Sequence, residues 1–178
     1  MIAAESQSAK LGVWLFIAAD LMFFLGLVGA YMVLRSGQPE VFAVGAISKS
    51  LAAMEVICLL AGSLGMFTAT TVAKRDPSFG LIVPLAEVFL AAAFFLITTA
   101  KSIEYQSLPM DALHACYFTL MAAHALHVAA AMIAILILLV QAMRGKILSA
   151  QTQLVAIYWH FLVLLWILLF PILFLAGT

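Results

Sequence analysis

Residues 121–140 read Met-Ala-Ala-His-Ala-Leu-His-Val-Ala-Ala-Ala-Met-Ile-Ala-Ile-Leu-Ile-Leu-Leu-Val and contain no permanently charged side chain. A helix of about 20 such residues is long enough to cross the hydrocarbon core of a membrane. The run is continuously apolar and lacks the alternation of a strand in a membrane barrel, so it predicts a helix. This stretch therefore indicates a protein whose solvent is a bilayer.

Four other stretches have the same character. Together they give five expected membrane helices, over residues 11–34, 50–73, 80–103, 114–140 and 152–176. The segments between them are short and hold turn-forming residues and most of the charges. The predicted fold class is an all-α membrane protein, a five-transmembrane-helix bundle in which residues 1–178 form one integral-membrane domain.

The composition agrees with a membrane location. The chain is 67% hydrophobic, against roughly 45–50% in ordinary globular proteins. Charged residues make up 9% of it, whereas a soluble protein carries about 25%. The net charge of zero argues against a nucleic-acid partner, because no basic stripe is available to contact phosphates. Cys58 and Cys116 lie inside apolar runs and predict neither a disulfide framework nor a metal knuckle.

The basic residues predict the orientation. Lys and Arg are more frequent in short loops on the cytoplasmic side of a membrane. The amino-terminal tail and the second and fourth connections carry Lys10, Lys74, Arg75, Arg144 and Lys146, whereas the opposite side carries Arg35, Lys49 and Lys101. We therefore expect a cytoplasmic amino terminus and an external carboxyl terminus. The first ten residues are too short and mixed for a signal peptide, so the first apolar run is expected to be a permanent anchor.

Carboxyl groups inside apolar helices are candidate functional residues, because a charge at mid-membrane costs about 2.5–3.5 kcal/mol on insertion scales. Asp20 lies in the first helix, and it fits either a neutral, hydrogen-bonded acid or a proton relay. Glu55 and Glu87 complete the set of candidate buried polar, proton-related groups, although their places nearer helix ends would also let them reach the headgroups. Glu104, beside Tyr105, is expected to be an interfacial anchor.

Three histidines, His124, His127 and His160, lie well inside the last two expected helices. His124 and His127 are three residues apart and share a helix face, but no carboxylates or cysteines lie at the spacing that a zinc or di-iron site needs. His127 and His160 could hold one b-type haem, so a haem-binding anchor of a quinone-linked oxidoreductase is an alternative function. Hydrogen bonds between helices are the favoured interpretation. A transporter would need broken helices in matched halves, which are not seen.

Four segments carry a family resemblance. Residues 10–24 read Lys-Leu-Gly-Val-Trp-Leu-Phe-Ile-Ala-Ala-Asp-Leu-Met-Phe-Phe, and residues 30–35 read Ala-Tyr-Met-Val-Leu-Arg. Residues 117–128 read Tyr-Phe-Thr-Leu-Met-Ala-Ala-His-Ala-Leu-His-Val, and residues 158–166 read Tyr-Trp-His-Phe-Leu-Val-Leu-Leu-Trp. With the Glu-Tyr pair at 104–105, the chain resembles subunit III of the haem–copper oxidases (cytochrome c or quinol oxidases) in its short, five-helix form.

The resemblance implies a non-catalytic subunit of a bacterial respiratory terminal oxidase, in which oxygen reduction is coupled to proton translocation. It implies a place in the bacterial inner (plasma) membrane beside the catalytic subunit I and subunit II, with haem and copper in the catalytic partner. This chain would hold no cofactor, bind phospholipid, support proton uptake and protect the active site during turnover. A subunit III-like accessory protein of a nitric oxide reductase is a further alternative. The electron donor, cytochrome c or quinol, stays open.

The resemblance also assigns roles to individual residues, none of them catalytic or metal-binding. Asp20 falls where many members have a buried acidic residue, often Glu. Structural or lipid-associated roles fall to Trp14, Arg35, Glu104, His124, His127, Tyr158, Trp159, His160 and Trp166. The sequence departs from the family at Ala125, where glycine is usual, and at Glu55, where Asn is more common.

Overall fold

The structure is a computed structural model, which describes residues 2–37, 48–75, 79–105, 111–146 and 149–175. Side chains are described for residues 7–37, 51–75, 80–103, 111–146 and 149–174. The described residues form helices and turns, with no strand among them.

Five long helices cross the molecule. They are α1 (Ile2–Ser36), α2 (Ser48–Arg75), α3 (Ile82–Tyr105), α4 (Ala112–Met143) and α5 (Ser149–Phe170). A short 3-10 turn, η1 (Phe79–Leu81), precedes α3, and one π-helical turn, η2 (Pro171–Leu175), follows α5. Each long helix contains a span long and apolar enough to cross a membrane. The prediction of an all-α, five-helix membrane bundle is confirmed.

Helix α4 begins and ends at residues that cap it. The Asp111 carboxylate accepts hydrogen bonds from the backbone N–H of His114, at 2.8 Å, and from its ring Nδ1, at 2.7 Å. The backbone bond satisfies a donor that the first turn of a helix leaves without a partner. At the other end Gly145 has a φ of +69°, and its N–H and that of Lys146 donate to the carbonyls of Ala142 and Gln141. These caps extend α4 beyond the expected 114–140.

The end of α5 is distorted by a proline. Pro171 has no N–H to donate to the preceding turn, and the backbone there widens into η2. The Arg35 guanidinium, at the end of α1, donates to the carbonyl oxygen of Ile172 at 2.9 Å and lies 6.0 Å from the centre of the Tyr31 ring. Arg35 therefore joins the end of α1 to the end of α5.

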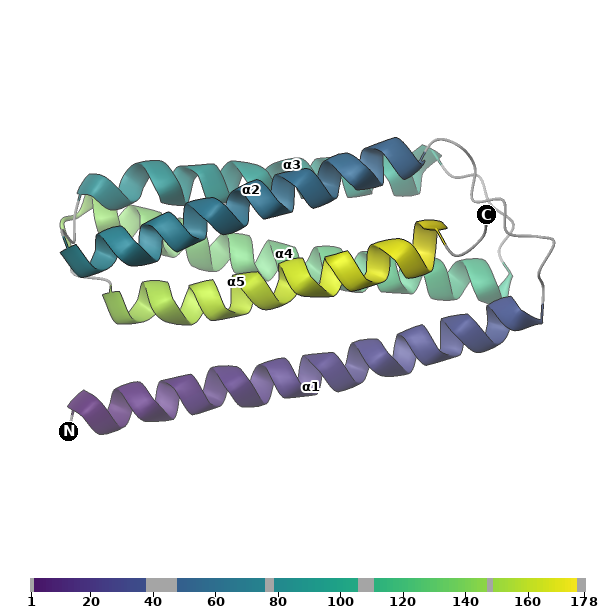
Figure 1. Cartoon of the computed structure of the whole chain (residues 1–178), viewed down its shortest axis with the longest axis horizontal. Coiled ribbons are helices and arrows are strands. Elements are labelled where there is room, and N and C mark those ends of the chain that lie inside the picture. Colours follow the sequence, from purple (N-terminus) through teal and green to yellow (C-terminus); the bar gives the residue numbers. More distant parts are fainter. Residues whose placement is uncertain (1, 38–47, 76–78, 106–110, 147–148, 176–178) are drawn as a thin grey trace.

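Helices α2 to α5 form a four-helix ring in which each helix packs against the next, and α5 closes the ring against α2. Helix α1 lies outside this ring and contacts α4 and α5, as Figure 1 shows along its lower side. Successive helices run in opposite directions, so α1 begins and α5 ends at opposite ends of the bundle (Figure 1). The two largest buried side chains in the ring, Trp159 and Trp166, both come from α5.

Candidate functional site

The contact between α1 and α4 brings together the two ionisable groups nearest the middle of these helices. The Oδ1 atom of Asp20 lies 3.3 Å from Nε2 of His127, and Asp20 is 7% exposed. The other ring nitrogen of His127, Nδ1, lies 2.6 Å from the carbonyl oxygen of Ala123, one turn earlier in α4. Both nitrogens of this imidazole are therefore engaged within the chain.

The chemistry of these contacts fixes how many protons the pair holds. A carbonyl oxygen accepts and cannot donate, so His127 Nδ1 must carry a hydrogen. In a neutral imidazole Nε2 is then an acceptor, and it faces a carboxyl oxygen. One proton is needed between Oδ1 and Nε2, either on Asp20 or on His127, because two acceptors would otherwise face each other. The pair can hold one proton and exchange it between the two atoms.

Two further polar atoms lie near this pair. The second carboxyl oxygen of Asp20, Oδ2, and the hydroxyl of Tyr158 are buried without a hydrogen-bond partner among the described residues. Tyr158 lies close enough to Asp20 for the two groups to interact electrostatically. The Phe24 ring covers the other side, with its centre 5.4 Å from that of His127. The pair is thus enclosed by aromatic side chains and retains capacity for further hydrogen bonds.

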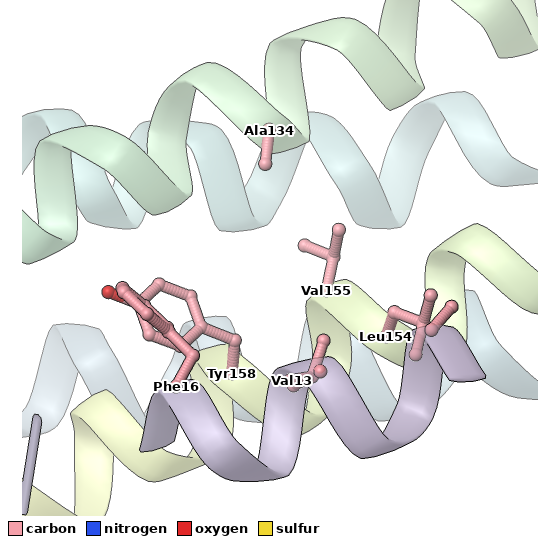
Figure 2. Close-up of a pocket in the computed structure, with 8 residues that line it drawn as sticks. Val13, Phe16, Ala134, Leu154, Val155 and Tyr158 are labelled. Carbon is pink, nitrogen blue, oxygen red and sulfur yellow. The ribbon is translucent and has the colours of Figure 1, made fainter. Parts of the chain in front are cut away.

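An apolar cavity of about 390 Å³ lies between α1, α4 and α5 on the amino-terminal side of Asp20. Figure 2 shows Val13 and Phe16 of α1 facing Ala134, Val155 and Tyr158 across it. The Phe16 and Tyr158 rings lie 5.5 Å apart. A second apolar cavity, of about 220 Å³, follows between α1 and α5. The packing of α1 against α4 and α5 therefore leaves two apolar cavities between these helices.

His124 lies inside the four-helix ring. It is completely buried, its Nε2 donates to the carbonyl oxygen of Leu162 at 3.1 Å, and its ring stacks on Trp166 with the centres 4.8 Å apart. The Phe95 ring meets both side chains edge-on, at 5.2 Å and 5.0 Å. This cluster joins α3, α4 and α5, so His124 has a packing environment and not an open site.

His160 and Trp159 face α2. His160 Nδ1 lies 2.9 Å from the hydroxyl oxygen of Ser63. Trp159 lies against Gly62, where an added Cβ would be 2.8 Å from the indole atom Cζ2. Trp159 and Trp166 are 0% exposed, so within this chain they pack the interior and do not contact lipid. Trp14 on α1 is 57% exposed and is the indole that faces outward.

The two glutamates expected to be buried differ in their exposure. Glu55 is 1% exposed and accepts a hydrogen bond from Thr99 at 3.3 Å, so it is buried and does not reach the headgroups. Glu87 is exposed, and the expectation that it is buried is wrong, because its carboxyl lies over Gly65 on the outer surface of α2 and α3. Glu104 belongs to α3, but its side chain lies outside the described part of the chain.

The positions of the histidines disagree with the haem alternative. His127 faces α1, whereas His160 faces α2, so the two rings do not point into a common gap. His127 also has no free nitrogen with which to bind iron. Among the described residues, no group of three His, Cys, Asp or Glu side chains has the arrangement of a metal site.

The sequence did not single out the partners of these groups. Ser63, Thr99 and Phe24 contact His160, Glu55 and His127, respectively, and each comes from a different helix than the group it contacts. For Ser63 and Thr99 the available signal was a hydroxyl side chain within a long apolar run, whereas Phe24 is one of many apolar residues in its run. The pairing itself depends on helix packing.

No family model matches the chain, but curated relatives match nearly all of it. It is 28% identical over 177 residues to the probable cytochrome c oxidase subunit 3 of Mycobacterium tuberculosis, covering 93% of this chain and 86% of that protein. It is 25% identical over 191 residues to the cytochrome c oxidase subunit 3 of Bacillus subtilis, covering 99% and 90%. It is 28% identical over 190 residues to the cytochrome bo(3) ubiquinol oxidase subunit 3 of Pseudomonas putida, covering 98% and 88%.

All of these relatives are subunits 3 of cytochrome c or quinol oxidases, and their similarity over nearly the entire chain supports the oxidase subunit III family. This confirms the resemblance found in its four sequence segments. The enclosed Asp20–His127 pair is the group that can exchange a proton, and apolar cavities lie beside it, whereas His124 and His160 are held in contacts between helices.

Proposed function

We propose that this chain is a non-catalytic subunit III of a bacterial respiratory haem–copper oxidase, in which it associates with the catalytic subunit I and with subunit II. The observation that carries this proposal is the similarity to oxidase subunits 3 over nearly the entire chain. Oxygen reduction takes place at the haem and copper of the partner. This chain supports the stability of the complex and the supply of protons to it.

The Asp20–His127 pair is the group that we assign to proton supply. It lies within a membrane span, it holds one proton, and the proton can reside on either of two atoms 3.3 Å apart. Glu55 is held by Thr99 between α2 and α3 and has a structural role in this proposal.

Phospholipid acyl chains fill the two cavities beside α1. Their linings are apolar, and both lie at the outer edge of the bundle, where lipid is the surrounding solvent. Trp14, on the outward face of α1, contributes to the same lipid-facing surface. We place the chain in the bacterial plasma membrane with its amino terminus in the cytoplasm, following the distribution of Lys and Arg.

Deletion of the chain in its native host tests this function. We expect oxidase activity in isolated membranes to begin near the wild-type rate and then to decay during continuous turnover. Expression of the wild-type chain from a plasmid should restore sustained activity. Loss of the oxidase haem bands in the deletion strain would instead indicate a role in assembly or haem insertion. Turnover kinetics identical to wild type would contradict the supporting role.

A further inference from the structure

One side of the Asp20–His127 pair has no assigned role in the proposed function. The Oδ1 atom of Asp20 faces His127, but Oδ2 is buried without a hydrogen-bond partner among the described residues. The hydroxyl of Tyr158, on α5, is likewise buried without one. A buried polar atom that lacks a partner costs free energy, and a bound water molecule can recover it. Both atoms therefore require a further hydrogen bond.

The Tyr158 hydroxyl lies on the side of its ring that faces along α1 toward Asp20. The Tyr158 and Phe16 rings lie 5.5 Å apart, and Asp20 follows Phe16 by four residues, one turn later on the same face of α1. Figure 2 shows the hydroxyl oxygen at the far side of these rings from Leu154 and Val155. Asp20 and Tyr158 interact electrostatically, yet neither is a hydrogen-bond partner of the other. The gap between them is therefore longer than one hydrogen bond.

The chemistry of this gap favours water over lipid. The cavity beside Tyr158 has an otherwise apolar lining, to which Asp20 does not contribute, so it suits the acyl chain assigned to it. An apolar cavity stays dry, whereas a buried water occupies a polar site in which it makes about 2–4 hydrogen bonds. An acyl chain has no donor for Oδ2 of Asp20. A water molecule can bond to Oδ2 and to the Tyr158 hydroxyl at once.

The direction of each hydrogen bond in this site follows from the pair. The shared proton lies between Oδ1 of Asp20 and Nε2 of His127, so Oδ2 acts as an acceptor wherever that proton resides. A water in the gap must then donate to Oδ2, and the Tyr158 hydroxyl can donate to the water. A hydrogen bond to a carboxylate is stronger than one to a neutral acid. Donation to Oδ2 therefore favours the state in which Asp20 is ionised and His127 carries the proton.

We propose that Oδ2 of Asp20 and the Tyr158 hydroxyl hold one water molecule between them, and that Tyr158 thereby positions the proton of the pair on Nε2 of His127. Tyr158 is a positioning residue, because it acts through the water and does not exchange the proton itself. This inference rests on the proton-supply role assigned to the pair and adds the residue that sets where its proton resides.

Infrared spectroscopy of the full chain in phospholipid vesicles tests for the water. We expect an O–H band that shifts in water labelled with the heavy oxygen isotope and that is lost in Tyr158→Phe, which keeps the ring and removes only the hydroxyl. Tyr117→Phe is the matched control, because it makes the same change at a buried tyrosine of α4 that packs against Phe174, and it should keep the band. Absence of an isotope-sensitive band from the wild-type chain, or its full retention in Tyr158→Phe, would overturn the inference.

Nitrogen NMR of isotope-labelled histidine tests the position of the proton. We expect His127 to give the signal of an imidazolium in the wild-type chain and to move toward that of a neutral ring, with its hydrogen on Nδ1, in Tyr158→Phe. The His127→Gln chain identifies which signal belongs to this residue. A purely structural role for Tyr158 would leave the signal in place, and that result would overturn the inference.

Both measurements use the chain without its partners, so they are separate from the test of the proposed function. Their failure would leave the oxidase assignment intact. A chain that purifies from native membranes without a haem-bearing subunit would contradict the proposed function and leave both spectra unchanged. If Tyr158→Phe does not fold, as its melting would show, the isotope-sensitive band and the His127 signal of the wild-type chain still decide the inference, because it requires both an ordered water and an imidazolium there.

Discussion

The Oδ1 atom of Asp20 and Nε2 of His127 lie 3.3 Å apart across the contact between α1 and α4, and the carbonyl of Ala123 holds the other imidazole nitrogen. This arrangement requires one proton between Asp20 and His127. It also provides one of the few polar contacts between α1 and the four-helix ring. The pair therefore links the packing of the outer helix to the protonation of a membrane carboxyl.

We expect Asp20→Asn to preserve the contact, because the Asn amide donates a hydrogen bond to Nε2 where the protonated acid would. Asp20→Leu removes the donor and should destabilise the chain by about 0.6–1.7 kcal/mol, the range measured for hydrogen bonds between membrane helices. Unfolding in a mixed detergent titration measures this difference. Proton pumping by the oxidase with Asp20→Asn measures whether proton transfer is needed. Equal stability of both variants would contradict the hydrogen bond, and unchanged pumping in Asp20→Asn would remove the relay role.

Gly62 is expected to be sensitive to the smallest substitution. An alanine Cβ there would lie 2.8 Å from Cζ2 of Trp159 and 3.1 Å from the Cβ of Ala91, so one of the helices must shift. Overpacking of this kind costs about 1–3 kcal/mol. Gly26→Ala is the matched control, because no atom lies within 4 Å of the added Cβ in α1. Equal thermal stability of the two variants would show that Trp159 adjusts without cost.

The cap of α4 predicts a pH-dependent contribution to stability. The hydrogen bond from the His114 N–H holds the pKa of Asp111 below its ordinary value of 3.8, with the His114 side chain as a further cause. A carboxyl with a lowered folded-state pKa stabilises the protein above pH 3.8 and loses this effect as the pH falls through the folded-state pKa. We therefore expect Asp111→Ala to lower the melting temperature at pH 7, and we expect the difference from wild type to shrink as the pH falls below 3.8 and through the lowered folded-state pKa of Asp111. A difference that stays constant down to the lowest pH would contradict a contribution from the ionised carboxylate.

Arg35 is expected to hold the π-helical end of α5. Arg35→Met keeps the apolar stem but removes the donor to Ile172, and a hydrogen bond from a charged donor contributes about 1.5–3 kcal/mol. The backbone amides of η2 should then exchange with deuterium faster, whereas those in the middle of α5 should keep their protection. Arg35→Lys tests whether a positive charge without the planar guanidinium is sufficient. Unchanged exchange in Arg35→Met would show that η2 is held by packing alone.

The five helices could be predicted from sequence because an apolar run of sufficient length determines a membrane helix without reference to other segments. The residues at which the helices begin and end were harder to predict from the sequence. Helix α1 begins at Ile2, nine residues before the expected start, since residues 2–10 contain no helix breaker. Pro171 lies within the last apolar run and converts its end into a π-helical turn.

The site was predicted in part. Asp20 and the histidines were found because ionisable groups are rare in apolar helices, but the pairing of Asp20 with His127 depends on how α1 packs against α4. Glu55 and Glu87 have similar positions near the amino-terminal ends of their helices, so the same burial is predicted for both from the sequence. Thr99 donates a hydrogen bond to the buried Glu55, whereas the carboxyl of the exposed Glu87 lies over Gly65, and both of these neighbours come from another helix.

Purification of the tagged chain from its native membranes tests the central claim most directly. We expect a haem-bearing subunit to co-purify in a fixed ratio, with a haem spectrum in the complex and no Soret band in the chain expressed alone. The His127→Ala chain is the control, because a haem ligated by this histidine would disappear in that variant. A stoichiometric haem in the isolated wild-type chain that is lost in His127→Ala, or a chain that purifies alone from native membranes, would contradict its assignment as a non-catalytic oxidase subunit.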